Sequence, residues 1–218
     1  MGNIKYLLIL FLICSTIASQ EISVARIKYN GGGDWYNGRT ELPNLLSRFS
    51  SELNVKTAQS EIVLEASSTD IFDFPMLFIT GHGRVIFSQK ERLNLRKYCR
   101  RGGLLYIDDD FGMDKFIREE LKKIFPGRVL VPLNPDFPLF GLWFVFPEGL
   151  PQIHIHEDSP PEAWGIFDDS GNLMVLYTYN SNISDGWDSP GVHPEDTPEI
   201  RETALRMGVN ILLYAILY

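Results

Sequence analysis

The sequence predicts an α/β domain in three layers, with a mostly parallel sheet and helices on both faces. The first observation is that strand and helix patterns alternate along residues 21–132. The second is residues 102–112, where two glycines end a helical pattern, four apolar residues follow, and three aspartates come next. Apolar runs bounded by glycine are typical of buried parallel strands. A length of 218 residues, 44% of them hydrophobic, suits one domain with a substantial core.

Residues 1–19 have the pattern of a secretory signal peptide. Lys5 gives a positive start, an apolar run follows at residues 6–13, and small residues at 16–19 suit cleavage. An uncleaved anchor is the alternative, but the run is short for a span of roughly 20 residues. We therefore expect an exported protein, periplasmic or extracellular, whose mature domain is residues 20–218, without a transmembrane span.

Composition narrows the classes of partner. Without residues 1–19 the chain keeps 19 basic and 28 acidic residues, a net charge of −9. Such a charge disfavours nucleic acid or an anionic membrane surface as the partner. Cys99 is then the only cysteine, so no internal disulfide is expected. Its place in a predicted helix favours a buried apolar role over that of a nucleophile.

Strand patterns and helix patterns alternate in the first half of the chain. Residues 21–29 alternate apolar and polar side chains, as a strand does, and lead into three consecutive glycines at 31–33. Thr40 is placed to cap the next helix, whose buried face is formed by Leu42, Leu45, Leu46 and Phe49. Further strands are expected at 61–65, 74–80, 104–107 and 128–132, and helices at 88–101, opened by a capping box of Ser88 and Glu91, and at 114–125.

The pattern changes after residue 133, where we expect a β-rich extension on one edge of the sheet, near residues 140–180. Residues 153–156 alternate apolar side chains with histidine. A hairpin turn at 168–172 separates strand patterns at 164–167 and 173–179. A long polar loop follows. The last helix, at 199–217, is apolar around most of its girth and should pack on the sheet.

These segments together resemble the bacterial DUF4159 family, a domain of unknown function whose members look like the class I glutamine amidotransferase-like, flavodoxin-like superfamily. The resemblance covers nearly all of the mature chain and is carried by residues 31–36, 80–83, 102–112, 160–166, 182–187 and 206–210. It implies the same three-layer fold and no established activity. Amidotransferases of this fold place a nucleophilic cysteine on a sharp turn after a strand, and the comparable turn here, residues 107–112, has none. Glutaminase activity is therefore not expected.

Candidate site residues follow the predicted strand ends, where open α/β sheets bind ligands. His82 lies between two glycines and is the strongest single candidate for a catalytic or ligand-binding role, because imidazole titrates near neutral pH. Asp108, Asp109 and Asp110 follow the central strand, and Asp109 is the expected catalytic partner of His82. Three carboxylates could bind a hard cation, but neighbouring strand residues point to opposite faces. We therefore favour capping, solvation and pairing with an arginine for them over metal binding.

Two loops add further ligand-binding candidates. They are Gly32, Gly33, Asp34, Trp35 and Tyr36 after the first strand, and Asn180, Asp185 and Trp187 after the hairpin. An aromatic pair beside a carboxylate could line a pocket for a sugar or a peptide, whereas Trp35 could equally anchor its loop in the core.

His154 and His156 are the candidate metal ligands. Their spacing places both side chains on one face if the segment is a strand, and imidazole suits zinc. An exposed edge strand without metal explains the same spacing, so a divalent metal cofactor is not favoured.

The sequence leaves several functions open. We favour an exported, non-catalytic binding or assembly domain that holds a peptide, glycan or protein partner at the ligand edge of the sheet. The alternative is a hydrolase, metal-assisted or not, that uses His82 with one of Asp108, Asp109 and Asp110. A purely structural domain is the third. Convergence of His82, Asp34 and the aspartates in one place is the condition on which the hydrolase depends.

Overall fold

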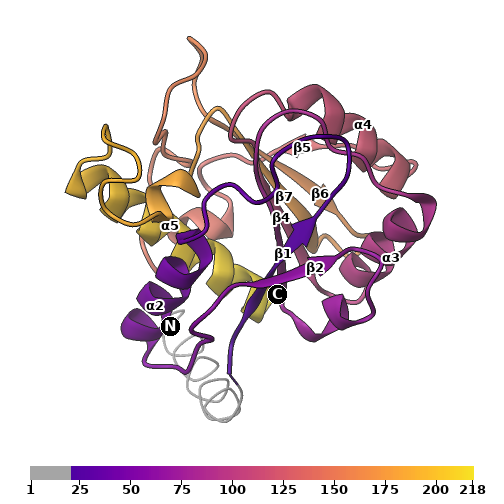
Figure 1. Ribbon diagram of the computed structural model, residues 1–218, viewed down its shortest axis with the longest axis horizontal. Coiled ribbons are helices and arrows are strands. Elements are labelled where there is room, and N and C mark those ends of the chain that lie inside the picture. Colours follow the sequence, from indigo (N-terminus) through magenta and orange to yellow (C-terminus); the bar gives the residue numbers. More distant parts are fainter. Residues whose placement is uncertain (1–20) are drawn as a thin grey trace.

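The computed structural model describes residues 21–218, so the predicted signal peptide lies outside the described residues. A seven-stranded sheet in the order β2-β1-β3-β4-β7-β6-β5 runs through the middle of the molecule (Figure 1). Its parallel strands are β1 (Val24–Lys28), β2 (Ile62–Glu65), β3 (Met76–Ile79), β4 (Leu104–Asp108) and β7 (Leu173–Tyr179). The expected mostly parallel sheet is confirmed.

Helices cover both faces of this sheet. α2 (Glu41–Leu53) and α5 (Pro198–Leu217) lie on one face, and α3 (Gln89–Cys99) and α4 (Asp114–Ile124) lie on the other (Figure 1). Each pair packs on its own hydrophobic cluster. Phe78 belongs to one cluster and Ile79 to the other, because successive strand residues point to opposite faces. The three layers expected from the alternation are therefore present.

Local signals explain the helix positions, with one exception. Ser88 and Glu91 form the expected capping box, each side chain accepting from the backbone N–H of the other residue. The face with Leu42, Leu45, Leu46 and Phe49 is buried. Thr40 precedes α2 but makes no cap, because its hydroxyl donates to Asp188 instead. A contact across the fold therefore replaces the local one.

The region expected to be β-rich contains less strand than its sequence suggested. β5 (Val131–Pro132) and β6 (Glu162–Phe167) form an antiparallel edge beside β7, whereas β7 itself is a parallel strand within the sheet. The strand expected at 128–132 is reduced to β5. Residues 153–156 form no strand, because the backbone N–H of Ile153 donates to Ser181 in the loop after β7 rather than to a strand.

Three short 3-10 helices, η1 (Asp70–Asp73), η2 (Pro138–Gly141) and η3 (Asp185–Trp187), complete the described elements. Within residues 21–218, none of the helices combines the length and the apolar character that crossing a membrane requires.

Candidate functional site

The loops after β1, β3, β4 and β7 meet at one edge of the sheet, because these four strands are parallel neighbours. The loop after β3 carries His82, and the chain after β4 carries Asp109 and Asp110. Backbone bridges join His82 to Phe111 and Asn30 to Ile86. The structure thus brings the imidazole and the carboxylates, which are far apart in sequence, into one cluster.

His82 is held between two carboxylates. Its Nδ1 lies 3.0 Å from Asp34 Oδ2 and 3.1 Å from Asp110 Oδ2. Its backbone N–H also donates to Asp34 Oδ1. The side chain is 46% exposed, and within residues 21–218 its Nε2 has no hydrogen-bond partner. An imidazole oriented in this way can bind a ligand, or exchange a proton, on its outer nitrogen.

Gly81 and Gly33 allow this close approach of the loops. Gly81 has φ +120°, and a Cβ there would lie 2.8 Å from Asp34 Oδ1 and from the Tyr29 hydroxyl. A Cβ on Gly33 would lie 2.6 Å from the carbonyl oxygen of His82. Gly32, at φ +94°, faces open space and is required for its backbone conformation alone.

Asp108 and Asp109 are tied to the fold by hydrogen bonds. Asp108 is fully buried and accepts from Thr178 Oγ1 at 2.5 Å and from the backbone N–H of Ser184 at 2.7 Å. Asp109 accepts from the backbone N–H of Met113 at 2.9 Å, at the start of α4. Burial raises the pKa of each carboxyl to about 6. Among the described residues, His82 pairs with Asp34 and Asp110 rather than with Asp109, the partner expected from the sequence.

Asp110 is the aspartate that faces His82. It also accepts from Asn37 Nδ2 at 2.6 Å and from Asn182 Nδ2 at 2.7 Å. Burial, and then the charge of Asp185, raise the pKa of this carboxyl. Each of the three aspartates therefore has its own protein donors, and they do not converge on one point.

Asn182 links this cluster to the one around Asp185. The amide is fully buried, and Nδ2 lies 2.9 Å from His156 Nε2 and 3.1 Å from Asp185 Oδ2, in addition to its bond to Asp110. Its Oδ1 is buried without a hydrogen-bond partner in the described part of the chain. An amide has only two N–H groups for these three acceptors, so one N–H is shared between two of them or one of the contacts carries no hydrogen bond.

His154 and His156 point to different partners. His154 Nδ1 lies 3.1 Å from Asp185 Oδ2 and its Nε2 lies 2.8 Å from Asp196 Oδ1, and these bonds raise the pKa of the imidazole to about 9. His156 faces Asn182 and the ring of Phe111, and burial lowers its pKa. The shared strand face expected from their spacing is wrong, because the segment is a loop.

The remaining candidate residues either have structural roles or lie at the surface. Trp187 is fully buried against Phe78 and Tyr106, so it lies in the core and not on a ligand-binding surface. Asn180 donates to Ser159 and accepts from the backbone of residues 156 and 157, which ties the two loops together. Trp35 is partly buried in the core. Tyr36 is 56% exposed and meets it edge to face.

A pocket of about 270 Å³ lies beside this edge, between the ends of β4 and β7. Its wall combines carboxylates with aromatic rings and one lysine, and includes Asp110, Phe111, Lys115, His156, Glu157 and Tyr179. Phe111 is 50% exposed. Carboxylates beside flat apolar faces suit a ligand that carries hydroxyl or ammonium groups.

Sequence reasoning missed several residues of these clusters. Asn37 and Asn182 lie in loops that were already singled out, and the strand-end rule could have found Asn182. Asp188, His193 and Asp196 lie in a long polar loop that has no local pattern. Cys99 is buried in α3, and burial raises the pKa of its thiol strongly, as expected for an apolar role.

Comparison with known protein families gives a match over almost all of the described chain. The family model described as a domain of unknown function, DUF4159, matches residues 23–216. No curated protein matches the chain significantly.

Proposed function

The chain belongs to the DUF4159 family, and from this premise we propose that it is an exported, non-catalytic binding or assembly domain. Its ligand would be the peptide or glycan part of a partner, held in the pocket between the ends of β4 and β7. Export rests on the signal-peptide pattern of residues 1–19.

The observation that carries this proposal is the hydrogen bonding of the strand-end carboxylates. Asp108 and Asp109 are bonded within the fold, and Asp110 is held by Asn37, Asn182 and His82. Carboxylates that already accept hydrogen bonds from the protein are better suited to shaping a binding surface than to activating a nucleophile. The exposed face of Phe111 and the acidic side chains around it supply the contacts that a hydroxyl- or amine-bearing ligand needs.

Titration of the ¹⁵N-labelled mature chain by NMR tests this proposal. The probes are glucosamine, N-acetylglucosamine and the tripeptide lysyl-glycyl-glycine. We expect amide shifts confined to the pocket, and their loss in Phe111→Ala. Val129→Ala is the matched control, because Val129 is an exposed apolar side chain outside the pocket wall. Absence of shifts with all three probes, or equal shifts in Phe111→Ala, would contradict the proposal.

A hydrolase remains the second candidate because of His82 alone. Its Nδ1 is held by Asp34 and Asp110 while the ring is half exposed, an arrangement that suits a general base acting on water. Release of nitrophenol from p-nitrophenyl acetate, phosphate and glucoside tests this activity. Turnover that His82→Gln abolishes would favour the hydrolase, and turnover that persists in this variant would rule out His82 as its base.

A further inference from the structure

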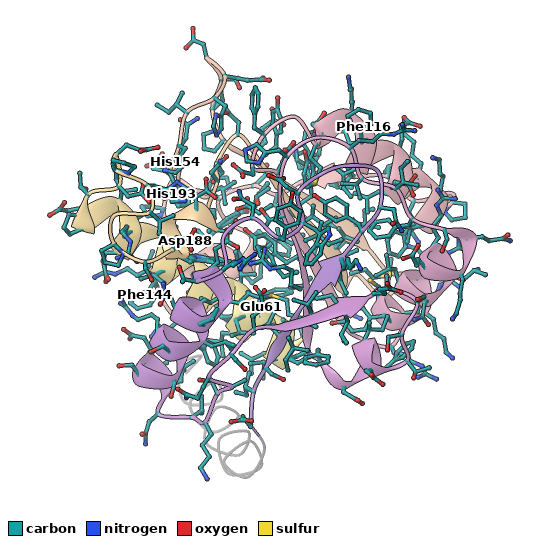
Figure 2. All side chains as sticks on the ribbon, viewed as in Figure 1. Glu61, Phe116, Phe144, His154, Asp188 and His193 are labelled. Atoms are coloured by element: carbon teal, nitrogen blue, oxygen red, sulfur yellow. The ribbon has the colours of Figure 1, made fainter. Side chains whose placement is uncertain are left out.

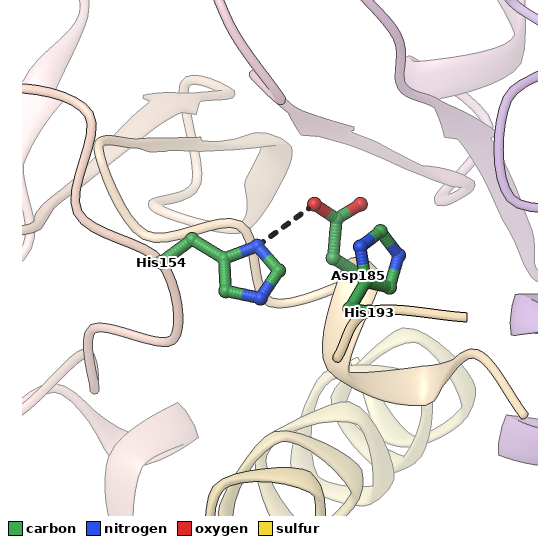
Figure 3. Close-up of side chains that lie close together, drawn as sticks. All are labelled: His154, Asp185 and His193. Atoms are coloured by element: carbon green, nitrogen blue, oxygen red, sulfur yellow. Dashed lines mark hydrogen bonds and ion pairs between the residues drawn. The ribbon is translucent and has the colours of Figure 1, made fainter. Parts of the chain in front are cut away.

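A second cluster of imidazoles and carboxylates lies apart from His82, where three loops meet. His154 comes from the loop before β6, Asp185 from η3, and His193 from the loop before α5. One ligand atom from each lies within 4.8 Å of the others. The rings of His154 and His193 have centroids 5.2 Å apart. Figure 2 shows His154 and His193 on the same side of the molecule, and Figure 3 shows both rings beside the Asp185 carboxylate.

The cluster carries more buried negative charge than its partners balance. Asp185, Asp188 and Asp196 are each nearly buried, with side chains 3–5% exposed. In residues 21–218, the only basic side chains that pair with these three carboxylates are His154 and His193. Buried carboxylates are costly unless they are paired or coordinate a metal, so three of them beside two histidines favour a bound cation.

An unpartnered ring nitrogen in the same cluster is the second observation. His193 Nε2 is buried and accepts or donates no hydrogen bond in the described chain. Its ion-pair contact with Asp188 Oδ2, at 3.4 Å, does not have the geometry of a hydrogen bond. His154 Nε2 lies 2.8 Å from Asp196 Oδ1, and metal-bound histidines are usually oriented by such a carboxylate on the nitrogen that does not coordinate, so Nδ1 beside Asp185 is the atom that would bind the ion. The imidazole of His193 therefore has a free coordinating atom where positive charge is needed.

We propose that His154, His193 and Asp185 bind one divalent transition-metal ion of the zinc type. Asp196 holds the other ring nitrogen of His154 and so orients this ligand. Two imidazoles with carboxylates suit zinc and its neighbours, whereas calcium and magnesium prefer oxygen ligands alone. Zinc binds at about 2 Å from each ligand atom, so rotations of the side chains must draw the three atoms together. This metal site is additional to the proposed binding function. The ion would join three loops and would thereby hold in place His156, which lines the pocket.

Metal titration of the full mature chain, first treated with chelator, tests the proposal. Competition with a chromophoric chelator should give one equivalent of zinc, undiminished by excess calcium or magnesium. Cobalt should give the visible absorption of a four-coordinate ion. Zinc should also raise the midpoint of thermal unfolding. Less than one equivalent, or equal competition by calcium, would overturn the proposal whatever the variants show.

Two matched histidine variants locate the ion. His193→Gln, at a side chain that is 23% exposed, should weaken zinc binding by about 100-fold or more. His82→Gln removes another imidazole that lies between carboxylates, and should leave the zinc affinity unchanged. Circular dichroism and unfolding in the presence of chelator show whether each variant is folded. Equal weakening by both variants, or none by His193→Gln when it is folded, would refute this site.

Discussion

Replacing Asp109 by asparagine should remove part of the pH dependence of stability. The Tyr177 hydroxyl lies 2.7 Å from Asp114 Oδ1 and 3.2 Å from Asp109 Oδ2. One phenolic proton can serve only one of these carboxylates, and the shorter contact favours Asp114. Asp109 Oδ2 therefore receives the longer and weaker of the two contacts, while its Oδ1 accepts from the backbone N–H of Met113. This agrees with the pKa of Asp109, which burial raises from 3.8 to about 6.

The sign and size of this pH dependence of stability follow from the raised pKa of Asp109 in the folded chain. Between pH 4 and 6 the folded chain keeps a proton on Asp109 that the unfolded chain has lost, so stability falls as the pH increases through that window. At about 1.4 kcal/mol per pKa unit, the loss is complete above pH 6 at roughly 3 kcal/mol. Asp109→Asn has no carboxyl to ionise, and its amide can accept from Met113 and donate to Tyr177.

Urea unfolding from pH 4 to pH 8 measures this difference. The free energy of unfolding of Asp109→Asn, relative to the natural chain, should rise by roughly 3 kcal/mol across the range. Asp136→Asn changes one charge at an exposed position and should alter stability by about 0.5 kcal/mol or less. Parallel curves for the natural chain and Asp109→Asn would show that Asp109 is ionised at little cost, and the hydrogen-bond assignment would be wrong.

Three substitutions test the packing around the site by urea unfolding. Trp187→Ala should lower the free energy of unfolding by ~3–5 kcal/mol, because the ring is fully buried. A decrease of less than about 1 kcal/mol would place the ring outside the core. Gly81→Ala should lower the free energy of unfolding by ~1–3 kcal/mol more than Gly83→Ala, because only a Cβ at position 81 would overlap its neighbours. Equal decreases would show that the loops do not approach closely at Gly81. Arg26→Met should cost ~3–5 kcal/mol by leaving Glu41 buried without its countercharge, and adding Glu41→Leu should restore much of the loss; no recovery would exclude that explanation.

Local patterns predicted most of the secondary structure correctly. The apolar run at 104–107 became β4, the capping box opened α3, and the apolar final helix became α5. These features depend on neighbours in the chain. Where a longer-range contact competed, the local signal failed, as at Thr40, whose hydroxyl bonds to Asp188 rather than capping α2.

The sequence alone determined the layers, the parallel core of the sheet and the glycine-flanked ends of its strands, because burial and backbone preference act over a few residues. Only the tertiary structure decided which side chains meet there. It joined His82 to Asp34 and Asp110, moved Trp187 into the core, and brought His193 to His154 from a loop without a pattern. These contacts depend on the conformations of the loops at the edge of the sheet. The sequence of one segment does not indicate which distant residues lie next to it in the folded chain.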